Sequence, residues 1–198
     1  MKKGILITLG VIVGIIVLWF MIFGGVYNGL VAREEGVTSA WAQVENVYQR
    51  RMDLVPNLVQ TVKGYAAHES ETLQNVVEAR SKISQTNISS DAISDPSKLQ
   101  AFQKMQGQLS SALSRLMVVV ERYPDLKASK NFLALQSQLE GTENRISVER
   151  RRFNEAARNF NTYRRKFPNV IISNMMDFQK KAYFKSDEGA QKAPQVQF

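Results

Sequence analysis

His68 and Glu69 are the residues whose types and spacing come nearest to a known catalytic motif. They begin like the helical zinc-protease motif H-E-x-x-H, in which two histidines hold the metal. The position of the second histidine is Thr72, and the chain has no other histidine and no cysteine. A zinc site needs at least three protein ligands. We therefore predict no metal and no cofactor, and we expect His68 and Glu69 to cap the start of a helix.

Three carboxylates near apolar positions, Glu45, Asp53 and Glu143, are the second candidate for chemistry. Positioned carboxylates can act as general acids and bases. Ionised groups beside a hydrophobic core must be paired, however, and arginines are available for this. Ordinary solvated positions are one interpretation of these residues. The other is a set of ion pairs that fix the register of helices: Arg50 or Arg51 with Glu143 or Glu149, and Asp53 with Arg150 or Arg151. A catalytic site is the least favoured interpretation.

Motifs for nucleotide binding and for nucleophilic catalysis are missing from the sequence. There is no G-x-x-x-x-G-K-[ST], no G-x-G-x-x-G, and no Ser/His/Asp order with supporting turns. The sequence therefore predicts a protein that is not an enzyme.

The chain is basic, with 26 lysines and arginines against 18 acidic residues in 198. The segment 145–166 alone carries eight basic and two acidic residues. Such a ridge either solvates the outer face of a helix or contacts lipid headgroups or an acidic partner. Nucleic acid is disfavoured, because the sequence offers neither a recognition helix nor an aromatic stacking platform.

The N-terminal segment from Gly4 to Val26 contains no charged residue. Its 23 residues would form a helix of about 35 Å, enough to cross a hydrocarbon core of about 30 Å. Trp19 and Tyr27 lie where interfacial aromatic residues are expected. A cleaved signal peptide is the alternative, but the stretch exceeds the usual length of such a core and no A-x-A-like site follows. We predict a retained transmembrane anchor.

Basic residues on the two sides of this segment predict its orientation. Lys2 and Lys3 precede it, whereas Arg33 is the nearest basic residue after it. The positive-inside rule then places the N-terminus in the cytoplasm and the rest of the chain outside it. The margin is one charge, so the opposite orientation stays open.

Helical periodicity continues to the end of the apolar pattern. Between Val37 and Ala66 apolar residues recur at steps of three and four, and Pro56 predicts a kink near Met52–Pro56 without a stop. We expect a second helix from near His68 to about Ile83, with Leu73, Val76, Val77 and Ile83 facing inward. A third begins at Pro96 behind Asp95 as N-cap and continues to Tyr123, where Pro124 ends it. A fourth carries Phe132, Leu139, Ile146, Phe153, Phe160 and Phe167 at intervals of seven.

These segments predict an all-α protein: a single transmembrane helix followed by an antiparallel four-helix bundle with long helices. We expect an anchor over residues 1–30, a bundle over 31–184 and a polar tail over 185–198. Whether the anchor and the first bundle helix are continuous stays open. Gly24, Gly25 and Gly29 would give either a flexible exit from the membrane or a close-packing face.

Several long motifs make the chain resemble the bacterial LemA family. They are WAQVENVYQRRMDLVPNLVQTVKGYAAHE from Trp41, YPDLKA from Tyr123, LEGTENRI from Leu139, and Phe167-Pro168. The resemblance implies an N-terminal transmembrane helix, a LemA-like helical bundle and no established enzymatic activity. It also implies a role in membrane organisation, with magnetosome formation in one branch, and occurrence near membrane metallopeptidases.

The resemblance also points to structural or interaction residues. They are Trp41, Glu45, Arg51, Asp53, Pro56, Asn57, His68, Glu69, Glu143, Asn144, Arg151, Asn154 and Asn161. Where the family usually has tyrosine before two of these asparagines, this chain has Phe153 and Phe160, which favours a packing role for those rings.

We therefore predict a non-enzymatic scaffold anchored in the bacterial inner membrane that self-associates and organises membrane or envelope proteins. The expected partners are the lipid bilayer, further copies of the chain, and a membrane protease or other envelope protein. The alternative is an adaptor or regulator of a membrane metallopeptidase.

Overall fold

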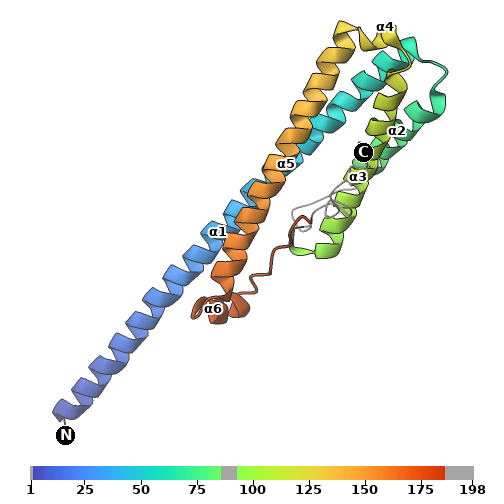
Figure 1. Ribbon diagram of the computed structural model, residues 1–198. Coiled ribbons are helices and arrows are strands. Elements are labelled where there is room, and N and C mark those ends of the chain that lie inside the picture. Colours follow the sequence, from blue (N-terminus) through green and yellow to red (C-terminus); the bar gives the residue numbers. More distant parts are fainter. Residues whose placement is uncertain (1, 86–92, 186–198) are drawn as a thin grey trace, which may run out of the picture.

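The computed structural model describes residues 2–85 and 93–185, and every regular element in those ranges is a helix (Figure 1). This confirms the all-α prediction. The elements are α1 (Lys2–Tyr65), α2 (Ser70–Ser84), α3 (Pro96–Val120), α4 (Pro124–Lys127), α5 (Lys130–Arg165) and α6 (Asn169–Met175). All of the predicted polar tail except its first residue, Lys185, lies outside the described residues.

Helix α1 is 64 residues long and joins the apolar N-terminal segment to the rest of the molecule without a break. Large apolar side chains from Leu6 to Ile22 are exposed along its first part. Among the described residues, α1 alone is long and apolar enough to cross a membrane. From Phe23 onward the same helix packs against other elements, and we call this packed part of the molecule the body. The open question of continuity is thus answered: one helix forms both parts.

Neighbouring long helices of the body run in opposite directions (Figure 1). Helix α5 lies along α1, while α2 and α3 form a second pair beside the part of α1 that is farthest from the N-terminus. The short α4 connects α3 to α5, and α6 packs against α1 and α5 at the other end of the body.

Two hydrophobic clusters fill the body. The distal core lies far from the N-terminus and joins α1, α2, α3, α4 and α5; it comprises Met52, Leu54, Val55, Leu58, Val59, Val62, Ala66, Leu73, Val76, Ile83, Leu109, Ala112, Leu116, Val120, Leu126, Phe132 and Leu139. The proximal core lies nearer the apolar segment and comprises Val26, Leu30, Val37, Trp41, Val44, Tyr48, Ile93, Leu99, Phe102, Ile146, Phe153, Ala157, Phe160, Ile172, Phe178, Ala182 and Phe184.

Pro56 lies inside α1, which continues past it as predicted. A proline has no N–H to donate to the carbonyl four residues earlier, so it leaves the Met52 oxygen without its helical partner. The Nε atom of Arg80 on α2 donates to this oxygen at 3.0 Å. The proline therefore creates an acceptor on α1 that ties α2 to it.

The structure corrects three details of the predicted helices. Val77 is 49 % exposed, because it lies about 100° around α2 from the buried Val76 and cannot share its face. The third helix ends at Val120, and Pro124 begins α4, which suits a residue whose fixed φ favours the first helical turn. Phe167 is 82 % exposed, because α5 ends at Arg165 and the heptad register ends with it.

Candidate functional site

A non-helical segment of residues 177–185, here called the strap, is held against α5 by two asparagines seven residues apart. The Asn154 side chain donates to the Phe184 carbonyl at 3.0 Å and accepts from the Phe184 N–H at 2.9 Å. Asn161 does the same with Lys181, at 2.8 and 2.9 Å. One helix face thus pairs with the backbone of an extended segment through side-chain amides.

The strap completes the proximal core. Phe178, Ala182 and Phe184 are buried, and the Phe184 ring lies 6.0 Å from Trp41 and 5.5 Å from Phe153. The Ala182 N–H donates to the carbonyl of Ile93 at 2.7 Å. Trp41 is therefore a core residue, surrounded by rings from α3, α5 and the strap.

Sequence reasoning missed the strap. The available signal was the pair of asparagines seven residues apart on α5. The strap itself has no periodic pattern of apolar residues, and only the fold shows which backbone the amides meet.

Lys181 of the strap is buried, at 6 % exposure, and its charge is compensated. Its Nζ atom lies 2.7 Å from a carboxylate oxygen of Glu34 and 3.2 Å from the Ser94 hydroxyl. It also lies 5.4 Å from the centre of the Phe160 ring. The strap is therefore connected to α1 as well as to α5.

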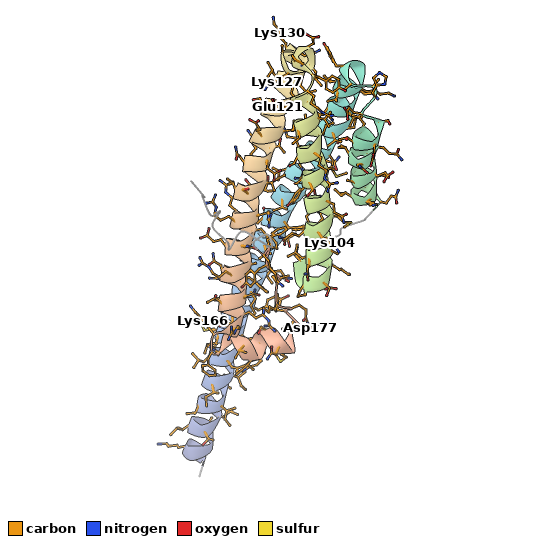
Figure 2. All side chains as sticks on the ribbon, turned by 45° about the vertical axis from the view of Figure 1, so that its right-hand side comes forward. Lys104, Glu121, Lys127, Lys130, Lys166 and Asp177 are labelled. Atoms are coloured by element: carbon orange, nitrogen blue, oxygen red, sulfur yellow. The ribbon has the colours of Figure 1, made fainter. Side chains whose placement is uncertain are left out.

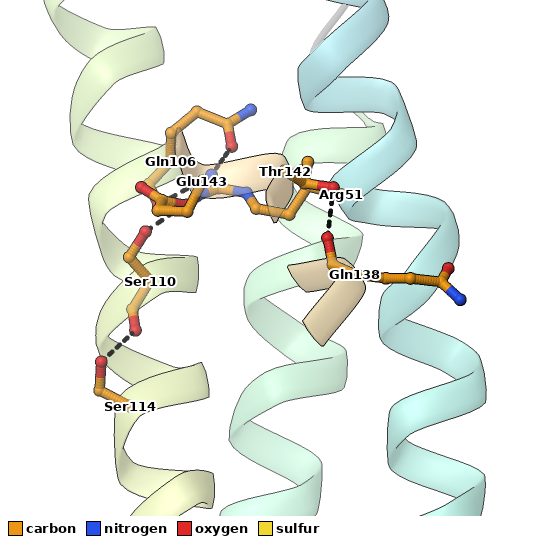
Figure 3. Close-up of polar contacts among 7 residues, drawn as sticks. All are labelled: Arg51, Gln106, Ser110, Ser114, Gln138, Thr142 and Glu143. Atoms are coloured by element: carbon orange, nitrogen blue, oxygen red, sulfur yellow. Dashed lines mark hydrogen bonds and ion pairs between the residues drawn. The ribbon is translucent and has the colours of Figure 1, made fainter. Parts of the chain in front are cut away.

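A polar network centred on Arg51 crosses the body between the two cores (Figure 3). Arg51 is 2 % exposed, and its Nη1 atom donates to Ser110 Oγ and to Glu143 Oε2, each at 2.9 Å. Its Nη2 atom donates to the side-chain and backbone oxygens of Gln106. One guanidinium therefore links α1, α3 and α5, as expected for a rigid fork of donors.

Of the ion pairs considered from the sequence, one forms. The pair of Arg51 with Glu143 is confirmed. The pairing of Asp53 with Arg150 or Arg151 is wrong: Asp53 is exposed and accepts from Gln49 one turn away at 2.8 Å. Arg150 instead donates to the carbonyl of Lys185 at 2.9 Å.

Other residues singled out by the resemblance lie at the surface. Pro56, Asn57, Asn144 and Arg151 are exposed. The Asn57 carbonyl accepts from Thr61 at 2.8 Å, inside α1. These four therefore belong to neither the strap contacts nor the Arg51 network.

The prediction that His68 and Glu69 cap the second helix through their side chains is wrong. Glu69 is the N-cap residue of α2, but its side chain makes no cap hydrogen bond. It accepts instead from the Tyr123 hydroxyl at 3.0 Å and pairs with Arg122 at 3.0 Å, while His68 is exposed. The hydrogen bond to Glu69 raises the pKa of the Tyr123 hydroxyl. At α3 the predicted cap is confirmed, with Asp95 accepting from the N–H groups of Ser97 and Lys98.

Glu45 lies beside the indole of Trp41. Partial burial raises the pKa of the Glu45 carboxyl, and attraction to the indole N–H opposes this. The indole nitrogen has no described partner in hydrogen-bonding geometry, so its attraction for the carboxylate is electrostatic only. Among the described residues no group of three or more His, Asp or Glu side chains is placed to hold a metal ion, so the three candidate carboxylates do not gather at one point.

Glycines in α1 differ in what surrounds them. A Cβ atom at Gly29 would overlap the Tyr163 hydroxyl, so this position packs closely against α5. A Cβ atom at Gly24 or Gly25 would have no described atom of another residue within 4 Å. The same holds for Gly10 and Gly14, which lie four residues apart in the apolar segment. The Gly10–Gly14 spacing is that of transmembrane helix-pairing motifs, and sequence reasoning missed it.

The apolar exposed helix and the body attached to it define a membrane-associated, all-helical protein. The model of the LemA family matches residues 40–198. The chain belongs to the LemA family.

Similar proteins include one LemA protein and two magnetosome proteins. Protein LemA of Metamycoplasma hominis is 28 % identical over 171 residues, which are 86 % of this chain and 74 % of that protein. Magnetosome protein MamQ of Magnetospirillum gryphiswaldense is 27 % identical over 175 residues, and MamQ 2 of Paramagnetospirillum magneticum is 26 % identical over 175. Each magnetosome match covers 80 % of this chain and 64 % of the relative.

Proposed function

We propose that this protein is a non-enzymatic scaffold, a single-pass protein of the bacterial inner membrane that self-associates and organises other envelope proteins. The observation that carries the proposal is the unbroken α1, which runs from the exposed apolar segment into the body. A stiff connection fixes the orientation of the body relative to the bilayer, whereas a flexible linker would let it tumble.

Contacts around the junction support a rigid connection. Tyr163 of α5 packs on Gly29, and the guanidinium of Arg33 lies 3.8 Å from the centre of the Tyr163 ring. Tyr27 lies 5.9 Å from Phe178 of the strap. Helix α1 is therefore braced by α5 and the strap directly after the apolar segment ends.

Self-association is supported by the uncovered Gly10–Gly14 face. Small residues let two helix backbones approach closely in lipid, where packing replaces the hydrophobic effect as the driving force. Confinement to a membrane raises the effective concentration of the copies, so weak lateral contacts are enough to hold two copies together. We also propose that the body is an antiparallel bundle of four long helices. From the charge difference around the anchor, we propose that the body lies on the outer side of the membrane.

Cysteine crosslinking in membranes tests self-association directly, because the chain has no cysteine of its own. At roughly 100° per residue, Val17 lies on the Gly10–Gly14 face and Ile12 lies opposite. We expect Val17→Cys to give a disulfide-linked dimer on oxidation, and Ile12→Cys to give none. Adding Gly10→Leu and Gly14→Leu to Val17→Cys should abolish the dimer.

Equal crosslinking at both positions, or none at either, would contradict self-association through this face. Recovery of a membrane metallopeptidase as the crosslinked species, in place of a second copy, would favour the adaptor function instead. For sidedness, Lys130→Cys at the exposed start of α5 should react with a membrane-impermeant maleimide from outside the inner membrane. Reaction only after the membrane is opened would reverse the orientation.

A further inference from the structure

A pocket of about 710 Å³ lies beside the Arg51 network, between α1, α3, α5 and the end of the strap. Its volume falls within the range of roughly 300–1,000 Å³ that is typical of small-molecule sites. The lining is polar and charged, with several glutamines of α3 in it. None of the scaffold's proposed contacts uses this pocket.

The charges around the pocket are unbalanced. Four basic residues line it, and Glu143 is the one acidic residue among the described lining; the basic residues are Arg51, Lys104, Arg150 and Lys185. Glu143 is already paired with Arg51 and is itself 55 % exposed. The concave wall therefore concentrates positive potential, which attracts an anion.

Two residues of the pocket lining also carry buried donors for which the described part of the chain supplies no acceptor. Gln106 is 4 % exposed, and its Oε1 atom accepts from Arg51, which fixes the orientation of the amide. Its Nε2 atom then points away from Arg51 (Figure 3) and has no hydrogen-bond partner among the residues that the structure describes. The Nε atom of Arg51 is buried and likewise lacks a partner within residues 2–85 and 93–185. Buried polar groups are nearly always satisfied in folded proteins, so such donors indicate a missing acceptor.

We propose that this pocket binds a small molecule that bears a carboxylate or phosphate group. Its acidic oxygens would be attracted by Lys104 and Lys185, and a small turn of the Gln106 side chain toward the pocket would let them accept from its Nε2 atom. The remaining glutamines of α3 that line the pocket have both donors and acceptors and would contact polar groups on the rest of the ligand. Arg150 and Gln103 already hold the Lys185 carbonyl at the rim, which keeps the end of the strap in place beside the anion.

Isothermal titration of the full chain in detergent tests the proposal, with inorganic phosphate and citrate as separate probes at an ionic strength held constant with potassium chloride. We expect saturable binding of at least one probe at one site per chain, and the probe that binds identifies phosphate or carboxylate as the recognised group. Lys104→Gln with Lys185→Gln should weaken binding at least tenfold. Both side chains are exposed, so folding should be retained.

Lys130→Gln is a control for the loss of positive charge elsewhere, because Lys130 lies at the top of the body, away from Lys104 (Figure 2). Its affinity should equal that of the original chain. Gln106→Glu keeps the side-chain size but replaces the unpartnered donor by an acceptor, and it should abolish binding. Absence of saturable binding for both probes would overturn the proposal, as would equal affinity in all variants. The measurement does not depend on self-association, so failure of the scaffold function would be seen separately.

Discussion

The two cores of the body are built from different chemistry. The distal core is closed by helices apart from Ala66, which follows the end of α1, and it is almost wholly aliphatic, with Phe132 as its one aromatic side chain among the described members. The proximal core contains five phenylalanines, a tryptophan and a tyrosine, and three of its residues come from the non-helical strap. Both lie along the same α1 and α5, so the helices alone do not determine how a core is closed.

The difference follows from the number of helices available. Along the distal half, α2 and α3 cover α1 and α5. Along the proximal half, α2 is absent from the core, and the strap takes its place. An extended segment cannot satisfy its own backbone, so its N–H and C=O groups need partners from its neighbours. Asn154 and Asn161 supply them.

Truncation of one buried side chain in each core should give the largest effects. Phe153→Ala in the proximal core should cost about 3–5 kcal/mol of unfolding free energy, and Leu116→Ala in the distal core about 2–5 kcal/mol. Because Phe153 touches Phe184, only the first variant should release the strap before global unfolding. Chemical denaturation gives the free energies, and hydrogen exchange of the 181–184 amides shows the release. Equal protection of these amides in both variants would remove the distinction between the cores.

Loss of the two asparagine side chains should have the next largest effect. Asn154→Ala with Asn161→Ala leaves four strap backbone groups without these partners. We expect the free energy of unfolding to fall by about 2–4 kcal/mol, less than the full cost of four unsatisfied buried groups, because water reaches part of the strap. Asn161→Asp is a sharper control, because it keeps the acceptor for the Lys181 N–H but places a carboxylate against the Lys181 carbonyl. Its cost should equal or exceed that of the single alanine variant, because the buried carboxylate faces the carbonyl oxygen. Hydrogen exchange in the strap should rise while the distal core stays protected.

The contrast between the cores also explains how much the sequence could predict. Apolar side chains at steps of three, four and seven indicated the helices and most of both cores, since packing repeats with the helix period. Asp95 with Pro96 identified the start of α3 because capping is local chemistry. The membrane segment followed from length and charge alone.

The rest depends on contacts between residues far apart in the chain. The partner of Arg51 could be narrowed to two glutamates, but the choice of Glu143 depends on how α1 and α5 are aligned. The role of the two asparagines depends on the strap, which has no periodic signal of its own. The proline–arginine contact needs α2 to return along α1, which no local pattern specifies.

The contact between Arg80 and the Met52 carbonyl, in the distal half of the body, should have a smaller effect on stability. Arg80→Met should cost about 1 kcal/mol, because the Met52 carbonyl loses its donor. In a Pro56→Ala background the alanine N–H restores the helical bond, so the same arginine change should cost nearly nothing. A double-mutant cycle by urea denaturation should therefore give a coupling of about 1 kcal/mol. Strict additivity would show that the proline does not create the site for Arg80.

The smallest effect concerns Glu45 at the edge of the proximal core. Burial holds the pKa of this carboxyl above its ordinary value of 4.5, so the folded chain binds the proton more tightly than the unfolded chain. Stability then falls as the pH rises from 4.5 through the raised pKa, and stays lower above it. Glu45→Gln removes this dependence and should stabilise the protein at pH 7 by a few tenths of a kcal/mol, since solvent screens the exposed carboxylate. The gain should vanish below pH 4.5.

Glu35→Gln, which removes an exposed carboxylate on the same helix, is the control. If both variants shift the melting temperature equally across this pH range, the effect belongs to net charge and not to the position of Glu45 beside Trp41.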